Sequence, residues 1–156
     1  MFTRRVNASS IQKAHRLLGV QSVKGTSASQ LGLSARKQSS SIERSGFNLP
    51  TMSQLVVHND IVYISGQVDA SADDVKGQTK NILGQVDALL KEAGTDKTRL
   101  LTSNIWLKDI GEDFQAMNEV WVEWMDPDNK PVRATVEANL ARPNLLVEIQ
   151  VTAAKK

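Results

Sequence analysis

Two stretches near the C-terminal end alternate apolar and polar residues, the period-two pattern of half-buried β-strands. In residues 131–139, valines and alanines share one face and Arg133 lies on the other. In residues 145–153, leucine, valine and isoleucine share one face and Glu148 lies on the other. If the two strands pair through residues 141–144, Arg133 and Glu148 lie on neighbouring strands. This pair is therefore the best functional clue in the sequence.

The pattern upstream predicts a hairpin, a strand and two helices. Residues 52–65 predict a β-hairpin around the polar turn 58–60, whose Asn and Asp tolerate turn conformations. A capping sequence at 71–74 begins an amphipathic helix that Gly94 ends. Residues 100–107 predict a strand, and residues 112–125 predict a second helix.

The resulting order, ββαβαββ, predicts an α+β fold. Each helix has one apolar face, so we expect a two-layer sandwich in which both helices cover one face of a mixed sheet. The other face then stays open to water or to a partner. It is expected to carry Trp106 and Leu146 beside polar residues, which makes an oligomer interface plausible.

Composition excludes several classes of site. The 156-residue chain has no cysteine and only two histidines, His15 and His58. Thiol nucleophiles, disulfides and zinc–thiolate sites are therefore excluded, and a multi-histidine metal site is not expected. No apolar run approaches the roughly 20 residues of a membrane-spanning helix, so we expect no membrane association. The formal net charge of +2 indicates no particular partner.

The N-terminal segment differs from the rest. Residues 1–40 contain no acidic residue, are rich in serine and carry seven Lys or Arg. A basic, serine-rich, amphipathic segment is typical of an organellar transit peptide, so we assign residues 1–41 as a removable extension and residues 42–156 as the folded domain. The expected destination is the mitochondrial matrix, with the cytoplasm as the alternative. A disordered basic tail and a nucleic-acid-binding arm are the other interpretations of the segment.

Five short motifs, in order, resemble the reactive intermediate deaminase family (Rid, also called YjgF-like). The resemblance covers nearly all of residues 42–154. Its motifs are Ser65-Gly66-Gln67, Ile105–Asp109, Asp113-Phe114 with Met117-Asn118, Pro131–Val136 and Leu146–Ile149. Residues 42–44 and 52–54 look more like side branches of the family than like its best-known deaminase branch.

The resemblance implies a chorismate-mutase-like fold and a homotrimer with active sites in the clefts between subunits. It also implies hydrolysis of 2-imino acids, or their enamine tautomers, to 2-oxo acids and ammonia, without a cofactor. The alternative is a trimer that binds small carboxylates or a partner protein without catalysis. A ribonuclease is not expected, because the folded part offers no histidine pair and the basic residues gather in the extension.

Arg133 and Glu148 are the expected catalytic residues. A guanidinium binds a carboxylate through two parallel hydrogen bonds, so Arg133 would hold the substrate and position its imine carbon for water. Glu148 would orient that water and accept its proton. The alternatives are a solvated strand arginine, and a surface carboxylate or cross-strand ion pair.

Asn118, Ser65 and Thr135 are expected to bind substrate with Arg133. Asn118 lies on the apolar side of its predicted helix, where its amide needs a partner. Ser65 matches a site serine of the family, or it bonds the end of a strand. Thr135 stands where the best-known branch has cysteine, and Phe47 and Met52 stand where that branch has tyrosine. These departures leave the substrate range open.

Overall fold

The computed structural model describes residues 41–46 and 49–156 of the chain. The predicted extension falls on residues outside these ranges. The described elements are β1 (Glu43–Ser45), β2 (Leu55–His58), β3 (Ile61–Val68), α1 (Val75–Glu92), the 3₁₀ turn η3 (Lys97–Arg99), β4 (Leu100–Leu107), α2 (Ile110–Trp124), β5 (Val132–Glu137) and β6 (Val147–Ala154).

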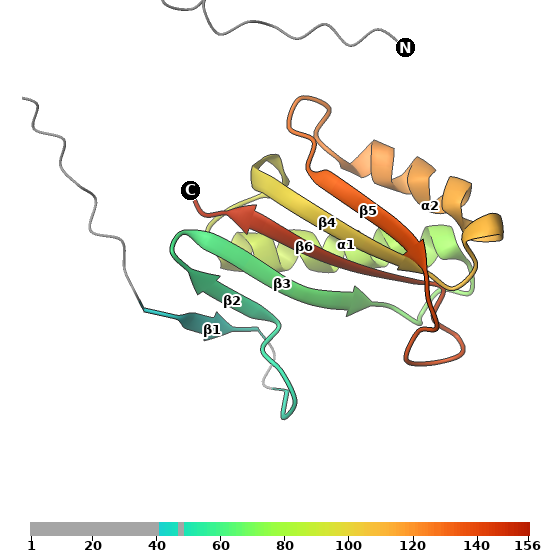
Figure 1. Cartoon of the computed structure of the whole chain (residues 1–156), viewed down its shortest axis with the longest axis horizontal. Coiled ribbons are helices and arrows are strands. Elements are labelled where there is room, and N and C mark those ends of the chain that lie inside the picture. Colours follow the sequence, from blue (N-terminus) through green and yellow to red (C-terminus); the bar gives the residue numbers. More distant parts are fainter. Residues whose placement is uncertain (1–40, 47–48) are drawn as a thin grey trace, which may run out of the picture. The chain divides into compact units, whose positions relative to one another are not determined.

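One six-stranded sheet carries two helices on one face (Figure 1). The strand order is β1-β2-β3-β6-β4-β5, in which β4 and β5 are parallel and the other neighbours antiparallel. Both helices share a core with the same face of the sheet. This confirms the α+β two-layer sandwich with a mixed sheet. We call the two sides of the sheet the helix-covered face and the open face.

The sheet has one strand more than the apolar pattern predicts. The additional strand β1 has only three residues, and all of them are exposed. A short, solvated edge strand has no alternating apolar positions, so periodicity cannot detect it.

The predicted hairpin and the end of the first helix are confirmed. Asn59 and Asp60 have φ values of 50° and 62°, the left-handed conformation of a tight two-residue hairpin turn. The carboxylate of Asp74 accepts the backbone N–H of Gly77 at 2.7 Å and begins α1. Gly94, with a φ of 75°, follows the end of α1. The second helix begins at Ile110, two residues before the expected start, because Asp109 caps it.

The two C-terminal strands do not pair with each other, so the condition that would place Arg133 and Glu148 on neighbouring strands is not met. Strand β4 lies between β5 and β6: Ser103 pairs with Arg133 on one side and with Val151 on the other. The segment β4–α2–β5 is a crossover that returns the chain parallel to β4, at the edge of the sheet. The loop after β5 then carries the chain past β4 to the centre, where β6 pairs with β3 and β4.

Strand β5 turns its apolar side outward. Val132 and Val136 lie on the open face with 70% and 47% of their surface exposed. Arg133 lies on the helix-covered face, because it pairs with buried Ser103 and contacts α2. On the open face Trp106 is half-buried as expected, but Leu146 packs against the core cluster instead.

Candidate functional site

Arg133 projects from β5 against α2. Its Nη1 donates to Oδ1 of Asn118 at 2.8 Å, and its guanidinium carbon lies 5.5 Å from the centre of the Trp121 ring. Asn118 and Trp121 are three residues apart on α2, so they project from the same side of the helix. The structure therefore brings together two predicted site residues, Arg133 and Asn118, and adds a tryptophan.

These contacts hold the guanidinium without neutralising it. Trp121 is 3% exposed, so its ring is a fixed platform for the cation. Burial lowers the pKa of Arg133, although a guanidinium stays protonated at neutral pH. No carboxylate within the described ranges forms an ion pair with Arg133. Asn118 occupies one N–H, which leaves other donors of the charged group for an anion.

Two hydroxyl groups near Arg133 lack hydrogen-bond partners. Thr135 follows Arg133 by two residues on the same side of β5, and Ser103 pairs with Arg133 from β4. Thr135 Oγ1 and Ser103 Oγ are both buried, and neither has a partner in the described part of the chain. Buried polar atoms without partners are unusual and require an explanation such as a ligand or ordered water. We call Arg133, Asn118, Trp121, Thr135 and Ser103 the arginine cluster.

Glu148 lies on the opposite face of the sheet. It pairs with Trp106 of β4 and Val68 of β3, both on the open face. A Cβ atom added to Gly66 would lie 1.9 Å from Oε1 of Glu148, so the carboxylate rests directly on the Gly66 backbone. Only glycine permits this approach. The alternative of a cross-strand ion pair with Arg133 is therefore excluded within one chain.

Ser65 lies beside Gly66, at the bulge of β3. The buried amide of Gln67 donates from Nε2 to Oγ of Ser65 at 3.0 Å and to its carbonyl oxygen at 2.9 Å. The strand is irregular between Ile64 and Gln67, which places Ser65 and Gly66 out of regular register. We call Glu148, Gly66 and Ser65 the glutamate cluster.

The two clusters are too far apart to act on one small molecule in one chain. Arg133 is level with Ser103 and Glu148 with Trp106, three residues further along β4, and β4 separates their strands. Standard strand spacings place their backbones roughly 14 Å apart, on opposite faces. The five predicted site residues thus lie in two separate clusters.

The fold and sequence have close counterparts. Residues 49–155 match the model of the protein family described as Endoribonuclease L-PSP. This chain belongs to the Rid/YjgF family. A RutC family protein of Haemophilus ducreyi is 41% identical over 103 residues, which cover 65% of this chain and 87% of that protein. The RutC family protein YoaB of Escherichia coli is 40% identical over 102 residues, which cover 65% and 89%.

A solved structure agrees with this assignment. NMB1025 of Neisseria meningitidis, a member of the YjgF protein family, superposes with a TM-score of 0.72 at 39% identity. The superposition covers 75% of this chain and 97% of that one. The described domain therefore spans nearly the whole length of its YjgF relatives.

The sequence prediction missed two members of the arginine cluster. Trp121 lies at helical spacing on an apolar face, as a core residue would, but its spacing of three from Asn118 also indicates a shared surface. Ser103 interrupts the buried side of β4, where Ile105 and Leu107 follow at intervals of two. A serine in such a row is a recognisable signal of a polar site.

Met52 is 48% exposed, and Phe47 lies outside the described residues. Among the residues that the structure describes, no group of three or more metal-ligating side chains comes together, and no helix is long and apolar enough to cross a membrane.

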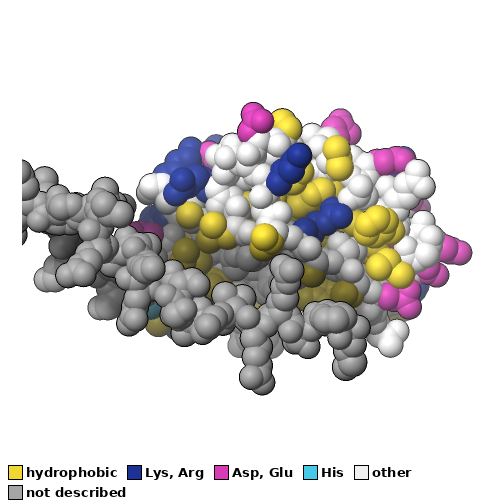
Figure 2. All heavy atoms as spheres, turned by 45° about the horizontal axis from the view of Figure 1, so that its top comes forward, with side chains coloured by type: hydrophobic (Ala, Val, Ile, Leu, Met, Phe, Trp, Pro, Cys, Tyr) yellow, Lys and Arg dark blue, Asp and Glu magenta, His cyan; other side chains and the backbone are white. Residues whose placement is uncertain are grey.

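Figure 2, which brings the upper side of Figure 1 forward, shows basic side chains among hydrophobic ones, with acidic side chains toward the rim.

Proposed function

We propose that this Rid/YjgF protein hydrolyses small 2-imino acids, or their enamine tautomers, to 2-oxo acids and ammonia. The observation that carries the proposal is Arg133, a partly desolvated cation held by Asn118 and Trp121 without a carboxylate partner. Such a group suits a small anionic substrate, because it is oriented before the substrate arrives. The family resemblance supplies the imine as the neighbouring electrophile.

The chemistry requires a base as well as an anion clamp. Water adds to the imine carbon, a proton leaves the water, the C–N bond breaks, and ammonia departs as the carbonyl forms. Glu148 is the carboxylate that would orient the water, accept its proton and return a proton to the leaving nitrogen. Arg133 would hold the substrate carboxylate throughout.

Because one chain separates Arg133 from Glu148, the proposal requires more than one copy. We propose a homotrimer in which the arginine cluster of one copy faces the glutamate cluster of the next. The open face supports such an assembly, because it presents a set of exposed large apolar side chains. These include Tyr63, Val132 and Val136, with 46%, 70% and 47% of their surface exposed.

A coupled assay tests the activity. An amino-acid oxidase generates 2-iminopropanoate from alanine, and the protein should accelerate the release of ammonia above the spontaneous rate. Arg133→Ala should abolish the acceleration. Arg142→Ala is the matched control, since Arg142 is an exposed loop arginine outside both clusters. No acceleration by the wild-type protein, or full activity in Arg133→Ala, would overturn the proposal.

Mixing two inactive variants tests the shared site. Arg133→Ala and Glu148→Gln are each expected to be inactive, but random mixed trimers should regain about one quarter of the sites, because some adjacent pairs combine two intact residues. Sites contained within one chain would show no recovery.

A substitution on the open face tests the assembly itself. Val136→Asp should prevent trimer formation, as measured by sedimentation velocity, whereas Val122→Asp, on the exposed surface of α2, should not.

A second candidate is a trimer that binds small 2-oxo acids without turnover. The separation of the two clusters supports this candidate, because the arginine cluster can bind an anion without the glutamate cluster. Thr135, where the best-known branch has cysteine, removes any role that requires a thiol. Calorimetry with pyruvate decides between them: binding that needs Arg133, without accelerated imine hydrolysis, supports the binding protein.

We also propose that residues 1–41 direct import into the mitochondrial matrix and are then removed. The composition of the segment supports this, since it is basic, rich in serine and free of acidic residues up to residue 40. Sequencing the N-terminus of the mature protein from cells tests it. A mature chain that still begins near Met1 would contradict removal.

A further inference from the structure

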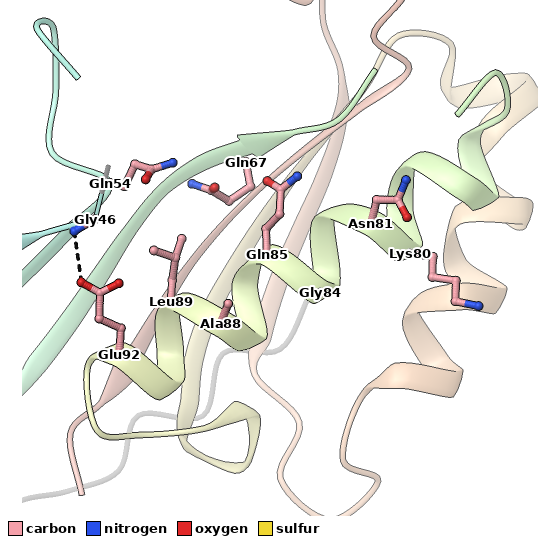
Figure 3. A pocket seen from close by; sticks show the side chains of 10 residues that line it. All are labelled: Gly46, Gln54, Gln67, Lys80, Asn81, Gly84, Gln85, Ala88, Leu89 and Glu92. Atoms are coloured by element: carbon pink, nitrogen blue, oxygen red, sulfur yellow. Dashed lines mark hydrogen bonds between the residues drawn. The ribbon is translucent and has the colours of Figure 1, made fainter. Parts of the chain in front are cut away.

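A cleft of about 800 Å³ lies between α1 and a wall that includes Gly46, Gln54 and Gln67 of β3. No residue of either cluster lines it, although Ser65 of the glutamate cluster accepts hydrogen bonds from the Gln67 amide. The volume of the cleft falls in the range of small-molecule sites. Figure 3 shows one wall formed by α1 and the other by Gln54 and Gln67. Arg133 and Glu148 are not among its lining residues. The cleft is therefore not explained by the proposed hydrolysis.

The α1 wall is unusually flat at its centre. Lys80, Gly84, Ala88 and Glu92 recur every four residues and form one ridge along the cleft. A Cβ atom added to Gly84 would meet nothing within 4 Å, so no packing against the described residues requires glycine. Glycine inside a helix costs about 0.5–1 kcal/mol relative to alanine. Here it leaves the helix backbone open to the cleft.

The opposite wall carries the side-chain amide of Gln67. Gln67 is only 4% exposed, and Figure 3 shows its side chain directed from β3 toward α1. Its Nε2 donates twice to Ser65, which fixes the orientation of the amide. Its carbonyl oxygen accepts no hydrogen bond from the described residues. This oxygen is not enclosed by the protein, so it is open to an N–H group of a ligand in the cleft.

The polarity of the cleft selects the ligand. The inner polar groups are uncharged amides, and Gln85 reaches from α1 toward Gln67 with both a donor and an acceptor (Figure 3). The charged residues, Lys80 and Glu92, lie at the two ends of the ridge, and their charges cancel. Glu92 already accepts the backbone N–H of Gly46 at 3.2 Å. A charged ligand would lose its hydration at the centre without gaining a counterion.

We propose that this cleft is a second binding site, for a neutral molecule with an apolar body and a carboxamide or related group that pairs N–H with C=O. The ligand N–H donates to the carbonyl oxygen of Gln67, and its C=O accepts from the amide of Gln85. The apolar body lies over Gly84 and Ala88 and against Leu89.

Cyclohexanecarboxamide is a suitable probe, and cyclohexanecarboxylate and cyclohexyl methyl ketone are matched controls. The carboxylate has nearly the same shape but carries a charge, and the ketone keeps the acceptor but lacks the donor. In ¹H–¹⁵N spectra of the full chain, the amide should cause saturable shifts at Gly84 and at the Gln67 side chain. The two controls should bind the cleft at least about tenfold more weakly.

Variants locate the site. Gly84→Leu fills the cleft and should weaken binding of the amide at least about tenfold. Ala88→Leu does the same from the next turn, in case the first variant folds poorly. Lys91→Leu places an equal side chain on the exposed side of α1, away from the cleft, and should leave binding unchanged. Arg133→Ala should also leave it unchanged, which separates this site from the proposed hydrolysis.

Four results would overturn the proposal. They are the absence of saturable shifts up to the solubility limit of the amide, shifts centred on β5 and α2 instead of the cleft, unchanged affinity in both leucine variants, and equal binding of the carboxylate in the cleft. None of these results depends on whether the protein hydrolyses imines.

Discussion

Strands β5 and β6 have nearly the same sequence pattern but opposite surroundings. In central β6 the apolar side is fully enclosed, with Ile149 and Val151 at 0% and 1% exposure. In edge strand β5 the apolar side faces outward, with Val132 at 70%. Alternation therefore separates two faces of a strand, but the neighbours of the strand determine which face is covered.

The same difference divides the candidate site. Because β5 turns its polar side toward α2, Arg133 meets Asn118 and Trp121. Because β6 turns its apolar side toward the helices, Glu148 is left on the open face over Gly66. In the proposed trimer, each strand supplies half of a site, and neighbouring copies bring the halves together.

The largest expected effect separates the roles of the two strands. Arg133→Ala should lower kcat/KM by about 10³-fold, equivalent to about 4 kcal/mol, because it removes the carboxylate clamp. Glu148→Gln should lower kcat by about 10²-fold or more, through loss of the base. Pyruvate binding by calorimetry should disappear in the first variant and persist in the second. Pyruvate binding that survives in Arg133→Ala would contradict this division of roles, in which Arg133 binds the carboxylate and Glu148 acts as the base.

Stability should follow the burial of each strand. Ile149→Ala opens a cavity in the core and should lower the free energy of unfolding by about 2–5 kcal/mol. Val136→Ala, on the open face, should change the stability of the isolated chain by less than about 1 kcal/mol. Urea unfolding at low protein concentration measures both. Equal losses would show that the open face is covered within a single chain.

Two glycines provide a smaller and more local test. Gly66→Ala forces the Glu148 carboxylate from its place and should lower kcat by about tenfold. This is equivalent to raising the activation free energy by about 1.4 kcal/mol. Gly84→Ala meets open space and should raise stability by about 0.5–1 kcal/mol without altering kcat. Thermal unfolding and the coupled assay separate the two. A loss of activity in Gly84→Ala would connect the α1 cleft to the chemistry.

The smallest effect lies outside both strands. Hydrogen bonds from Lys156 and Thr98 lower the pKa of Asp96 to about 2. Since the folded-state pKa is depressed, this stabilisation is present above the unfolded pKa near 4 and is lost as the pH falls toward about 2. Asp96→Asn should therefore reduce stability by less than about 1 kcal/mol at pH 7 and have almost no effect near pH 2. Urea unfolding at the two pH values checks this.

Local patterns predicted most of the fold because local interactions form those elements. The hairpin turn follows from two residues that accept positive φ, and α1 begins and ends where Asp74 and Gly94 satisfy its terminal groups. The strands that lie beside β5 and β6 could not be predicted in this way. Strand neighbours are chosen by the crossover through α2, which depends on how the whole helix packs on the sheet.

The candidate residues could likewise be identified from the sequence, but which of them lie together in space could not. An arginine and a glutamate on the polar sides of strands, and an asparagine on an apolar helix face, are visible as unusual positions in the chain. Trp121 shows the limit, because an aromatic residue at helical spacing looks like core until the cation above it is seen.

The sequence alone determined the elements other than β1, the α+β class and the resemblance to the Rid/YjgF family, because each depends on neighbouring residues or on short motifs in order. Only the tertiary structure decided that β4 separates β5 from β6, that Arg133 and Glu148 face opposite ways, and that a cleft opens beside Gly84. These features depend on strand order and on contacts between distant segments. Periodicity along a strand carries no information about its neighbours.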